Sequence, residues 1–128
     1  MQGRTQRALR SLTRLTRPLA LRSAGKAGSN TSVVRHVGRR SGRTYETPVV
    51  AVAHGDGFLI ALPYGDFTDW VKNVLAQGSA TVITDGRPYD VDCPEVIPMT
   101  EATAYFRPRE QRMQRRFRVE SAVRVHRT

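Results

Sequence analysis

From residue 31 onward, short runs of β-branched or alternating residues are separated by turn sequences that contain glycine. These turns are Ser41-Gly42, Gly55-Asp56-Gly57 and Asp85-Gly86, which are typical of tight connections between antiparallel strands. The runs between the turns have the composition and length of strands. The expected strands are Ser32–Val37, Thr44–Ala53, Phe58–Leu62, Ala80–Thr84, Tyr89–Cys93 and Ser121–His126. About six strands joined by short turns predict a mainly β, α+β fold: a small antiparallel barrel with helices on its outside.

The clearest helical pattern lies between Asp66 and Gly78. Asp66 is suited to cap a helix, and Gly78 supplies a C-terminal stop. Between them the large apolar residues recur at i, i+3, i+4, i+7 and i+8, which places them on one face: Phe67, Trp70, Val71, Val74 and Leu75. Asp66 and Asp69 are better explained by capping this helix than by catalysis.

The C-terminal third has weaker helical patterns. Residues 99–107 begin like a helix, which Pro108 interrupts. Residues 109–118 are cationic and hold only Met113 and Phe117 as apolar anchors, so we expect a surface helix at most.

The first thirty residues differ from the rest and are predicted to form a separate segment, 1–30, ahead of a domain at 31–128. Residues 4–17 form a basic amphipathic pattern that Pro18 ends or kinks, and residues 23–30 have linker composition. Three interpretations remain open: residues 4–22 bind an anionic membrane surface, they dock on the barrel, or they form a transit peptide. No hydrophobic run is long enough to span a membrane.

Positive charge is concentrated at the two ends of the chain. The formal charge is +10, with 11 basic and no acidic residues in 1–45, 2 against 9 in 46–106, and 8 against 2 in 107–128. This distribution favours two cationic surfaces for anionic partners over a protein that coats nucleic acid uniformly. The single cysteine, Cys93, excludes an intrachain disulfide and is typical of a reducing compartment.

A cationic loop, Gly38-Arg39-Arg40-Ser41-Gly42-Arg43, connects the first two expected strands. Gly42 can take positive φ, which leaves backbone N–H groups and the Ser41 hydroxyl free to face a ligand. Arginine adds forked donors that match phosphate or carboxylate oxygens. The loop leads into a strand, unlike a Walker loop, which leads into a helix. It is therefore either an anion receptor or a solvated basic turn.

A second group of residues lies at the end of a strand and the start of the central helix. Leu62-Pro63-Tyr64-Gly65 ends the strand, and Trp70 and Asn73 are neighbours three residues apart on the helix. Trp70 offers a flat apolar wall beside an amide that both donates and accepts, which suits a planar heterocycle with a phosphate tail. The alternative is a core tryptophan and a solvated asparagine.

Other chemistries have less support. His36, His54 and His126 are scattered without ligand spacing, so we expect no metal site. No Gly-x-Ser-x-Gly elbow is present. The basic residues of the N-terminal segment are not interleaved with aromatic residues, so no nucleic-acid partner is expected.

Three motifs stand out in this chain: Gly-Arg-Arg-Ser-Gly-Arg-x-Tyr-x-Thr-Pro at 38–48, Leu-Pro-Tyr-Gly at 62–65 and Asp-Trp-Val-Lys-Asn-Val-Leu-Ala at 69–76. Together they resemble the motifs of the deazaflavin-dependent nitroreductase and quinone reductase family. The resemblance covers residues 31–128. It implies a split β-barrel similar to the pyridoxamine phosphate oxidase type of flavin-binding protein. It also implies that reduced coenzyme F-420, an 8-hydroxy-5-deazaflavin, is the hydride donor.

The resemblance also implies a set of cofactor-binding residues. The loop would hold the phosphate end of the cofactor, through Arg39, Arg40, Ser41 and Gly42. The following strand would run along one side of the ring, with Tyr45, Thr47, Pro48, Val49 and Val50, and the end of a later strand would form the other side, with Ala61, Leu62, Pro63 and Tyr64. The helix start would lie near the polar chain, with Asp69, Trp70 and Asn73. Tyr64 is the first candidate to donate a hydrogen bond to the acceptor, and Tyr105 the second. Some family members place tyrosines near the C-terminus over the substrate, whereas this chain has none after Tyr105.

The predicted function is an oxidoreductase that passes a hydride from reduced coenzyme F-420 to a hydrophobic acceptor such as a quinone, an enone or a nitroaromatic. The alternatives are a flavin mononucleotide enzyme on the same barrel, a non-catalytic cofactor or lipid carrier, and a basic nucleic-acid-binding module. We expect a cytoplasmic location, with or without peripheral attachment to the inner face of the cell membrane, and either a monomer or a homodimer.

Overall fold

The computed structural model describes residues 31–128. The predicted amphipathic helix and the linker lie outside the described residues, so the division at residue 30 stays a prediction. Within residues 31–128, no helix is long and apolar enough to cross a membrane.

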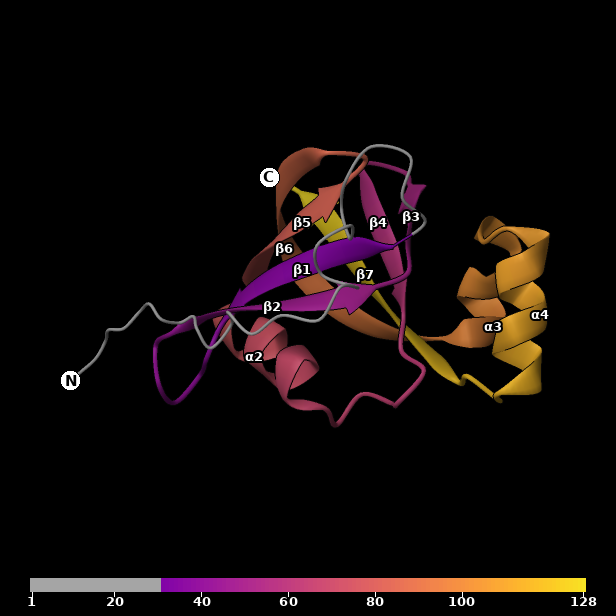
Figure 1. The fold of residues 1–128 in the computed structure, drawn as a ribbon, viewed down its shortest axis with the longest axis horizontal. Coiled ribbons are helices and arrows are strands. Elements are labelled where there is room, and N and C mark those ends of the chain that lie inside the picture. Colours follow the sequence, from indigo (N-terminus) through magenta and orange to yellow (C-terminus); the bar gives the residue numbers. More distant parts are fainter. Residues whose placement is uncertain (1–30) are drawn as a thin grey trace.

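Seven antiparallel strands form one curled sheet in the order β2-β1-β5-β6-β7-β4-β3 (Figure 1). The strands are β1 (Ser32–Val37), β2 (Thr44–Val49), β3 (Ala51–His54), β4 (Gly57–Ala61), β5 (Ser79–Thr84), β6 (Arg87–Pro98) and β7 (Ser121–Arg127). The split-barrel prediction is confirmed, with seven strands where six were expected.

The extra strand arises because the run predicted as one strand over Thr44–Ala53 divides at Val50. Strands β2 and β3 lie at opposite ends of the sheet, although only Val50 separates them in the chain. The sheet must therefore curl enough to bring the end of β2 beside the start of β3. The backbone carbonyl of Val50 also accepts a hydrogen bond from the Ala61 N–H of β4 at 3.1 Å. Pro48 lies in an edge strand, where its missing N–H costs no ladder hydrogen bond.

Strand β6 is longer than the predicted Tyr89–Cys93. It spans twelve residues, pairs with β5 through residues 87–92 and pairs with β7 through residues 91–98. A bulge interrupts the register between Asp92 and Glu95, and Cys93 there has a φ of 52°. The bulge bends β6, so that the strand can pair with β5 at one end and follow β7 around the curled sheet at the other.

Helix α2 (Asp69–Gln77) packs against β1, β5 and β6 below the sheet in Figure 1. Gly78 ends it with a φ of 78°, as predicted. The N-cap residue is Thr68, so the prediction that Asp66 caps the helix is wrong. The apolar face is narrower than predicted, because Phe67 and Leu75 are exposed.

Helix α3 (Met99–Ala102), the 3-10 turn η2 (Thr103–Tyr105) and helix α4 (Pro108–Arg116) form a second helical group at the other side of the sheet (Figure 1). Pro108 begins α4 at a position where its missing N–H is harmless. The helix lies on the surface as expected, but Met113 and Phe117 are exposed and do not anchor it. The buried residue of α4 is Gln114, which accepts a hydrogen bond from the Thr103 hydroxyl at 2.9 Å.

Two apolar clusters support the fold. The larger includes Val71 and Val74 of α2 and lies between this helix and the sheet. The smaller includes Met99 and Ala102 of α3 and lies under the second helical group. Four polar residues are buried among the described residues: Ser32, His36, Asn73 and Gln114.

Candidate functional site

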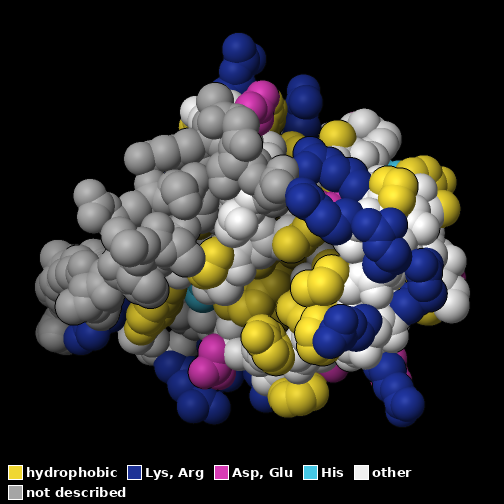
Figure 2. All heavy atoms as spheres, turned by 45° about the vertical axis from the view of Figure 1, so that its right-hand side comes forward, with side chains coloured by type: hydrophobic (Ala, Val, Ile, Leu, Met, Phe, Trp, Pro, Cys, Tyr) yellow, Lys and Arg dark blue, Asp and Glu magenta, His cyan; other side chains and the backbone are white. Residues whose placement is uncertain are grey.

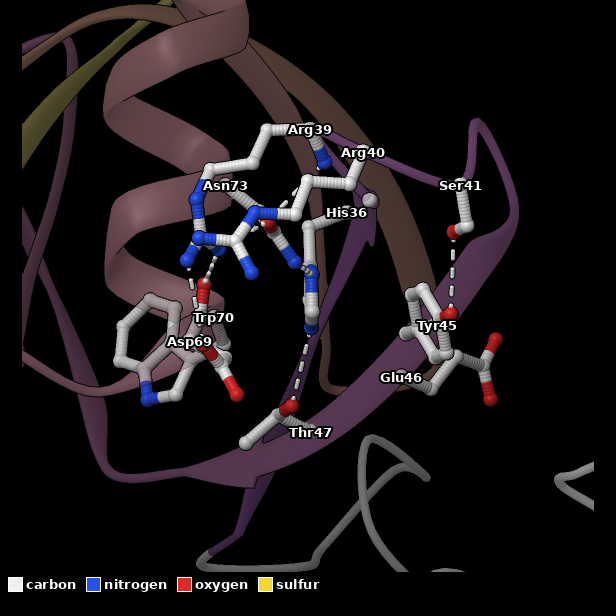
Figure 3. A pocket seen from close by; sticks show the side chains of 11 residues that line it. His36, Arg39, Arg40, Ser41, Tyr45, Glu46, Thr47, Asp69, Trp70 and Asn73 are labelled. Carbon is white, nitrogen blue, oxygen red and sulfur yellow. Dashed lines mark hydrogen bonds and ion pairs between the residues drawn. The ribbon is translucent and has the colours of Figure 1, made fainter.

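A pocket of about 540 Å³ lies where the β1–β2 hairpin meets the start of α2 (Figure 3). The end of β1, the cationic loop, β2 and the first turns of α2 each contribute to its wall. The lining residues are His36, Gly38, Arg39, Arg40, Ser41, Tyr45, Glu46, Thr47, Asp69, Trp70 and Asn73. Two groups that are far apart in the sequence, the loop and the helix start, thus meet at one site.

The loop is closed by its own backbone. The Gly38 N–H donates to the Arg43 carbonyl at 2.7 Å, and the Gly42 N–H donates to the Gly38 carbonyl at 2.9 Å. Gly42 has a φ of 72°, which favours glycine. A Cβ atom on Gly38 would lie 2.6 Å from the Ser41 Oγ and 2.8 Å from the Tyr45 Cε2. Glycine at position 38 therefore allows the Ser41 and Tyr45 side chains to close over the loop.

Arg39 is held against α2 by several contacts (Figure 3). Its Nη1 donates to the Asn73 Oδ1 at 2.7 Å, and its backbone N–H donates to the same oxygen at 3.1 Å. Its Nη2 forms an ion pair with the Asp69 Oδ1 at 3.2 Å. The Arg39 side chain is 22% exposed, so a fixed cation lies at the wall of the pocket.

Arg40 differs from Arg39 although both line the pocket. Its side chain also extends from the loop toward α2 in Figure 3. None of the ion pairs in the described part of the chain involves Arg40. Arg40 therefore differs from Arg39 in that no ion pair with another described residue fixes its guanidinium.

Ser41 takes part in the loop's own hydrogen bonds. Its Oγ accepts from the Arg43 N–H at 3.2 Å and lies 3.0 Å from the Tyr45 hydroxyl. The prediction that the Ser41 hydroxyl and the loop N–H groups are left free is therefore only partly right. The hydroxyl keeps one hydrogen-bonding position, and the N–H groups of Gly38, Gly42 and Arg43 are already used.

His36 lies at the base of the pocket, and the sequence interpretation did not include it. Its side chain is 4% exposed, and desolvation lowers the pKa of the imidazole to about 4. The Nε2 lies 3.0 Å from the Thr47 Oγ1, and the Nδ1 lies 3.1 Å from the Asn73 Nδ2. Tyr45 stacks on the ring at 5.8 Å between centroids, and Trp70 is tilted against it at 6.5 Å. The signal that could have found His36 is its place opposite Tyr45 in the hairpin register.

Gly38 and Glu46 also line the pocket and were not predicted as site residues. Glu46 forms a cross-strand ion pair with Arg35 at 2.9 Å. This pair neutralises an acidic group that would otherwise weaken the attraction of the pocket for anions.

Eight predicted cofactor-binding residues lie outside this pocket. Val49, Ala61 and Leu62 are buried in the core, Val50 is half-buried, and Gly42, Pro48, Pro63 and Tyr64 are exposed. Their contact with a cofactor stays a prediction.

The two tyrosines proposed for the acceptor are both accessible. Tyr64 is 78% exposed, and Tyr105 is 55% exposed with its ring edge-on to His54 at 4.3 Å.

An apolar surface lies on the side of the molecule that carries α3 and α4. Figure 2 shows hydrophobic side chains gathered there around a hollow, with Lys and Arg side chains beside it. Several large apolar side chains of the described residues are exposed: Tyr45, Tyr64, Phe67, Leu75, Tyr105, Met113 and Phe117. The molecule therefore offers apolar area for a hydrophobic ligand in addition to the polar pocket.

The donor set of the pocket fits a phosphate-bearing cofactor. It combines one fixed and one unpaired guanidinium, a hydroxyl and an aromatic wall, which match a phosphodiester and an acidic tail. Among residues 31–128 no three His, Cys, Asp or Glu side chains lie close enough to hold a metal ion.

Comparison with known proteins gives one family. The family model described as F420H(2)-dependent quinone reductase matches residues 10–127, and no curated protein matches this chain. Because the match covers nearly the whole sequence, the chain belongs to the F420H(2)-dependent quinone reductases, which transfer a hydride from reduced coenzyme F-420 to a quinone.

Proposed function

We propose that the pocket between the β1–β2 loop and α2 holds the phosphate and acidic tail of coenzyme F-420 in this oxidoreductase. The observation that carries the proposal is the fixed position of Arg39, which Asn73 and Asp69 hold before any ligand binds. A donor that is already ordered loses little conformational entropy on binding. Each charge-assisted contact that is shielded from water contributes about 1.5–3 kcal/mol.

The loop residues divide this task. Arg40 supplies unpaired donors to an oxygen anion, Arg39 supplies a fixed positive charge, and the Ser41 hydroxyl adds a neutral hydrogen-bonding group. Trp70 lines the pocket, and within this proposal it shields these contacts from water. Within this proposal, the segments that contain Pro48, Val50 and Pro63 contact the ring of the cofactor.

When bound, the reduced deazaflavin supplies the hydride, so the protein needs only to bind, orient and shield the reactants. We propose that the Tyr64 hydroxyl donates a hydrogen bond to the acceptor oxygen on which negative charge develops, with Tyr105 as the second candidate. Both tyrosines are exposed to solvent. Enones and nitroaromatics are proposed as further acceptors, because the apolar surface in Figure 2 would offer contact area to a flat hydrophobic molecule.

The N-terminal segment is proposed to attach the protein to an anionic membrane surface through residues 4–22, at the inner face of the cell membrane, where hydrophobic quinones dissolve. The test is sedimentation with anionic vesicles of the full chain and of a form that lacks residues 1–22. Equal partitioning of the two forms would contradict the attachment.

Titration of the purified protein with coenzyme F-420, followed by cofactor fluorescence, tests the pocket. The expected result is saturable binding at micromolar concentration, and at least tenfold weaker binding for the double variant Arg39→Ala with Arg40→Ala. A matched double variant, Arg112→Ala with Arg115→Ala on exposed α4, removes the same charge far from the pocket and should bind like the wild type.

Equal affinity of the loop variant and the helix variant would contradict the proposed site. Turnover with the reduced cofactor and a soluble quinone separates an enzyme from a non-catalytic binder. Competition with flavin mononucleotide tests whether the same phosphate donors accept the alternative cofactor.

A further inference from the structure

We propose that His36 is a positioning residue, which acts as a neutral imidazole with its proton on Nε2 to orient the Asn73 amide and through it the Arg39 guanidinium. This inference rests on the proposed function of the pocket. It assigns a role to the buried polar group at the base of the site, which has no part in the phosphate contacts described above.

The orientation of the Asn73 side chain follows from Arg39. Both the backbone N–H and the Nη1 of Arg39 reach the same atom of Asn73, at 3.1 and 2.7 Å. Arginine has donors only, so the Asn73 atom that faces it must be the oxygen. The amide nitrogen of Asn73 must then face the Nδ1 of His36, at 3.1 Å.

The orientation of Asn73 in turn fixes the protonation of His36. An amide NH₂ group can only donate, so the His36 Nδ1 must accept and therefore carries no proton. The single proton of the neutral ring then lies on Nε2 and is donated to the Thr47 Oγ1 at 3.0 Å. The chain of donors and acceptors thus runs in one direction, from Arg39 through Asn73 and His36 to Thr47.

The surroundings of the ring favour this neutral form. His36 is almost fully buried, and Tyr45 and Trp70 pack against the imidazole. The charged side chains that line the same pocket are Arg39, Arg40, Glu46 and Asp69, and none of them forms an ion pair with His36 in the described part of the chain. A second proton on the ring would point an N–H at the NH₂ group of Asn73. The amide would have to turn over, and it would then present its NH₂ group to Arg39.

Two conservative substitutions separate the halves of this network. In His36→Asn, the side-chain oxygen can take the place of Nδ1 and accept from Asn73. In His36→Gln, the longer amide can take the place of Nε2 and donate to Thr47. We expect coenzyme F-420 binding to weaken less than threefold in His36→Asn and about tenfold in His36→Gln.

The double variant tests whether the effect passes through Arg39. In an Arg39→Ala background, His36→Gln should weaken cofactor binding no further. A merely structural role for His36 would lower affinity by the same factor in both backgrounds, which would overturn the inference.

A measurement on the wild type needs neither variants nor cofactor. Nitrogen NMR of the histidine ring at neutral pH should show an unprotonated Nδ1 and a protonated Nε2 for His36. The opposite tautomer or a doubly protonated ring would overturn the inference even if the cofactor binds. Failure of the wild type to bind coenzyme F-420, with the expected tautomer intact, would instead overturn the proposed function.

Discussion

Two regions of this molecule are rich in arginine, and they differ in how the arginine side chains are held. In the β1–β2 loop, the Arg39 side chain is 22% exposed and is bonded to Asn73 and Asp69. On and beside α4, the arginines are exposed, and none of the ion pairs among residues 31–128 involves them: Arg109, Arg112, Arg115, Arg116 and Arg118.

The difference teaches that a count of positive charges does not locate an anion site. Exposed charges are screened by salt and lose much of their interaction energy to water. A guanidinium that a buried amide holds in place presents its donors in one geometry. The loop should therefore dominate cofactor affinity, although α4 and its flanks carry more arginine.

The largest effect is expected from removing Asn73, the residue that holds Arg39 of the loop in place. Asn73→Ala deletes the acceptor of Arg39 and the donor to His36, and Asn73 is 5% exposed. We expect coenzyme F-420 binding to weaken at least tenfold and the free energy of unfolding to fall by about 1–3 kcal/mol, because buried polar groups lose their partners. Lys72→Ala, an exposed neighbour on α2, is the matched control. Similar affinities for the two variants would mean that Arg39 does not need to be held.

The buried base of the pocket should also make stability depend on pH. The pKa of His36 is lowered from 6.5 to about 4, so the unfolded chain binds a proton in this range that the folded chain does not. Stability from this group is complete above pH 6.5, falls as the pH drops toward about 4, and is constant below that. The total change is about 3 kcal/mol.

Urea denaturation at a series of pH values measures this effect. His36→Phe should remove most of the slope between pH 6.5 and 4, whereas an arginine variant of α4 should retain it. An unchanged slope in His36→Phe would show that other groups cause the pH dependence.

A smaller perturbation leaves every charge in place and alters only the shape of the loop. In Gly38→Ala the new methyl group would press against the Ser41 Oγ and the Tyr45 ring. We expect cofactor affinity to fall about threefold to tenfold, measured by the same fluorescence titration. Gly42→Ala is a useful comparison, because nothing lies within 4 Å of its Cβ position and its cost is the positive φ of 72°, about 1 kcal/mol of stability.

The smallest effect on cofactor affinity is expected from removing the exposed arginines of α4. The triple variant Arg112→Ala, Arg115→Ala, Arg116→Ala removes three exposed cations of α4. Cofactor affinity should change less than twofold and the melting temperature by no more than a few degrees, since exposed charges contribute little to stability. A tenfold loss of affinity would show that α4 takes part in the site.

The sequence predicts most of the fold because its turns are marked by glycine and its central helix by a regular apolar spacing. It misses the break at Val50 because no turn residue separates two runs that both have strand composition. The sequence also underestimates the length of β6. Pro94 and Pro98 lower the strand propensity of its second half, although the curled sheet pairs this half with β7. Both misses depend on how strands wrap around the barrel.

The site is predicted in part for a similar reason. Arg39, Arg40 and Ser41 are recognisable because the turn that displays them is local. The contact of His36 with Asn73 is not recognisable, since Asn73 lies 37 residues away and meets His36 only when α2 packs on the hairpin. Spacing along the central helix indicated Trp70 and Asn73, and the resemblance to a family assigned them to the cofactor, but the contacts of Asn73 with Arg39 and His36 are found only in the three-dimensional structure.

The crossing at Val50 also has a consequence for how the chain folds. Because β2 and β3 are consecutive, the barrel closes only when the other strands between them in the sheet have found their places. Val33 must pair opposite Ile83, and Ile60 opposite Val123, which are contacts over about 50 and 60 residues. Chains whose contacts are mainly non-local fold in milliseconds to seconds. The pocket needs both the local hairpin and helix α2, so it is complete only once α2 has packed on β1.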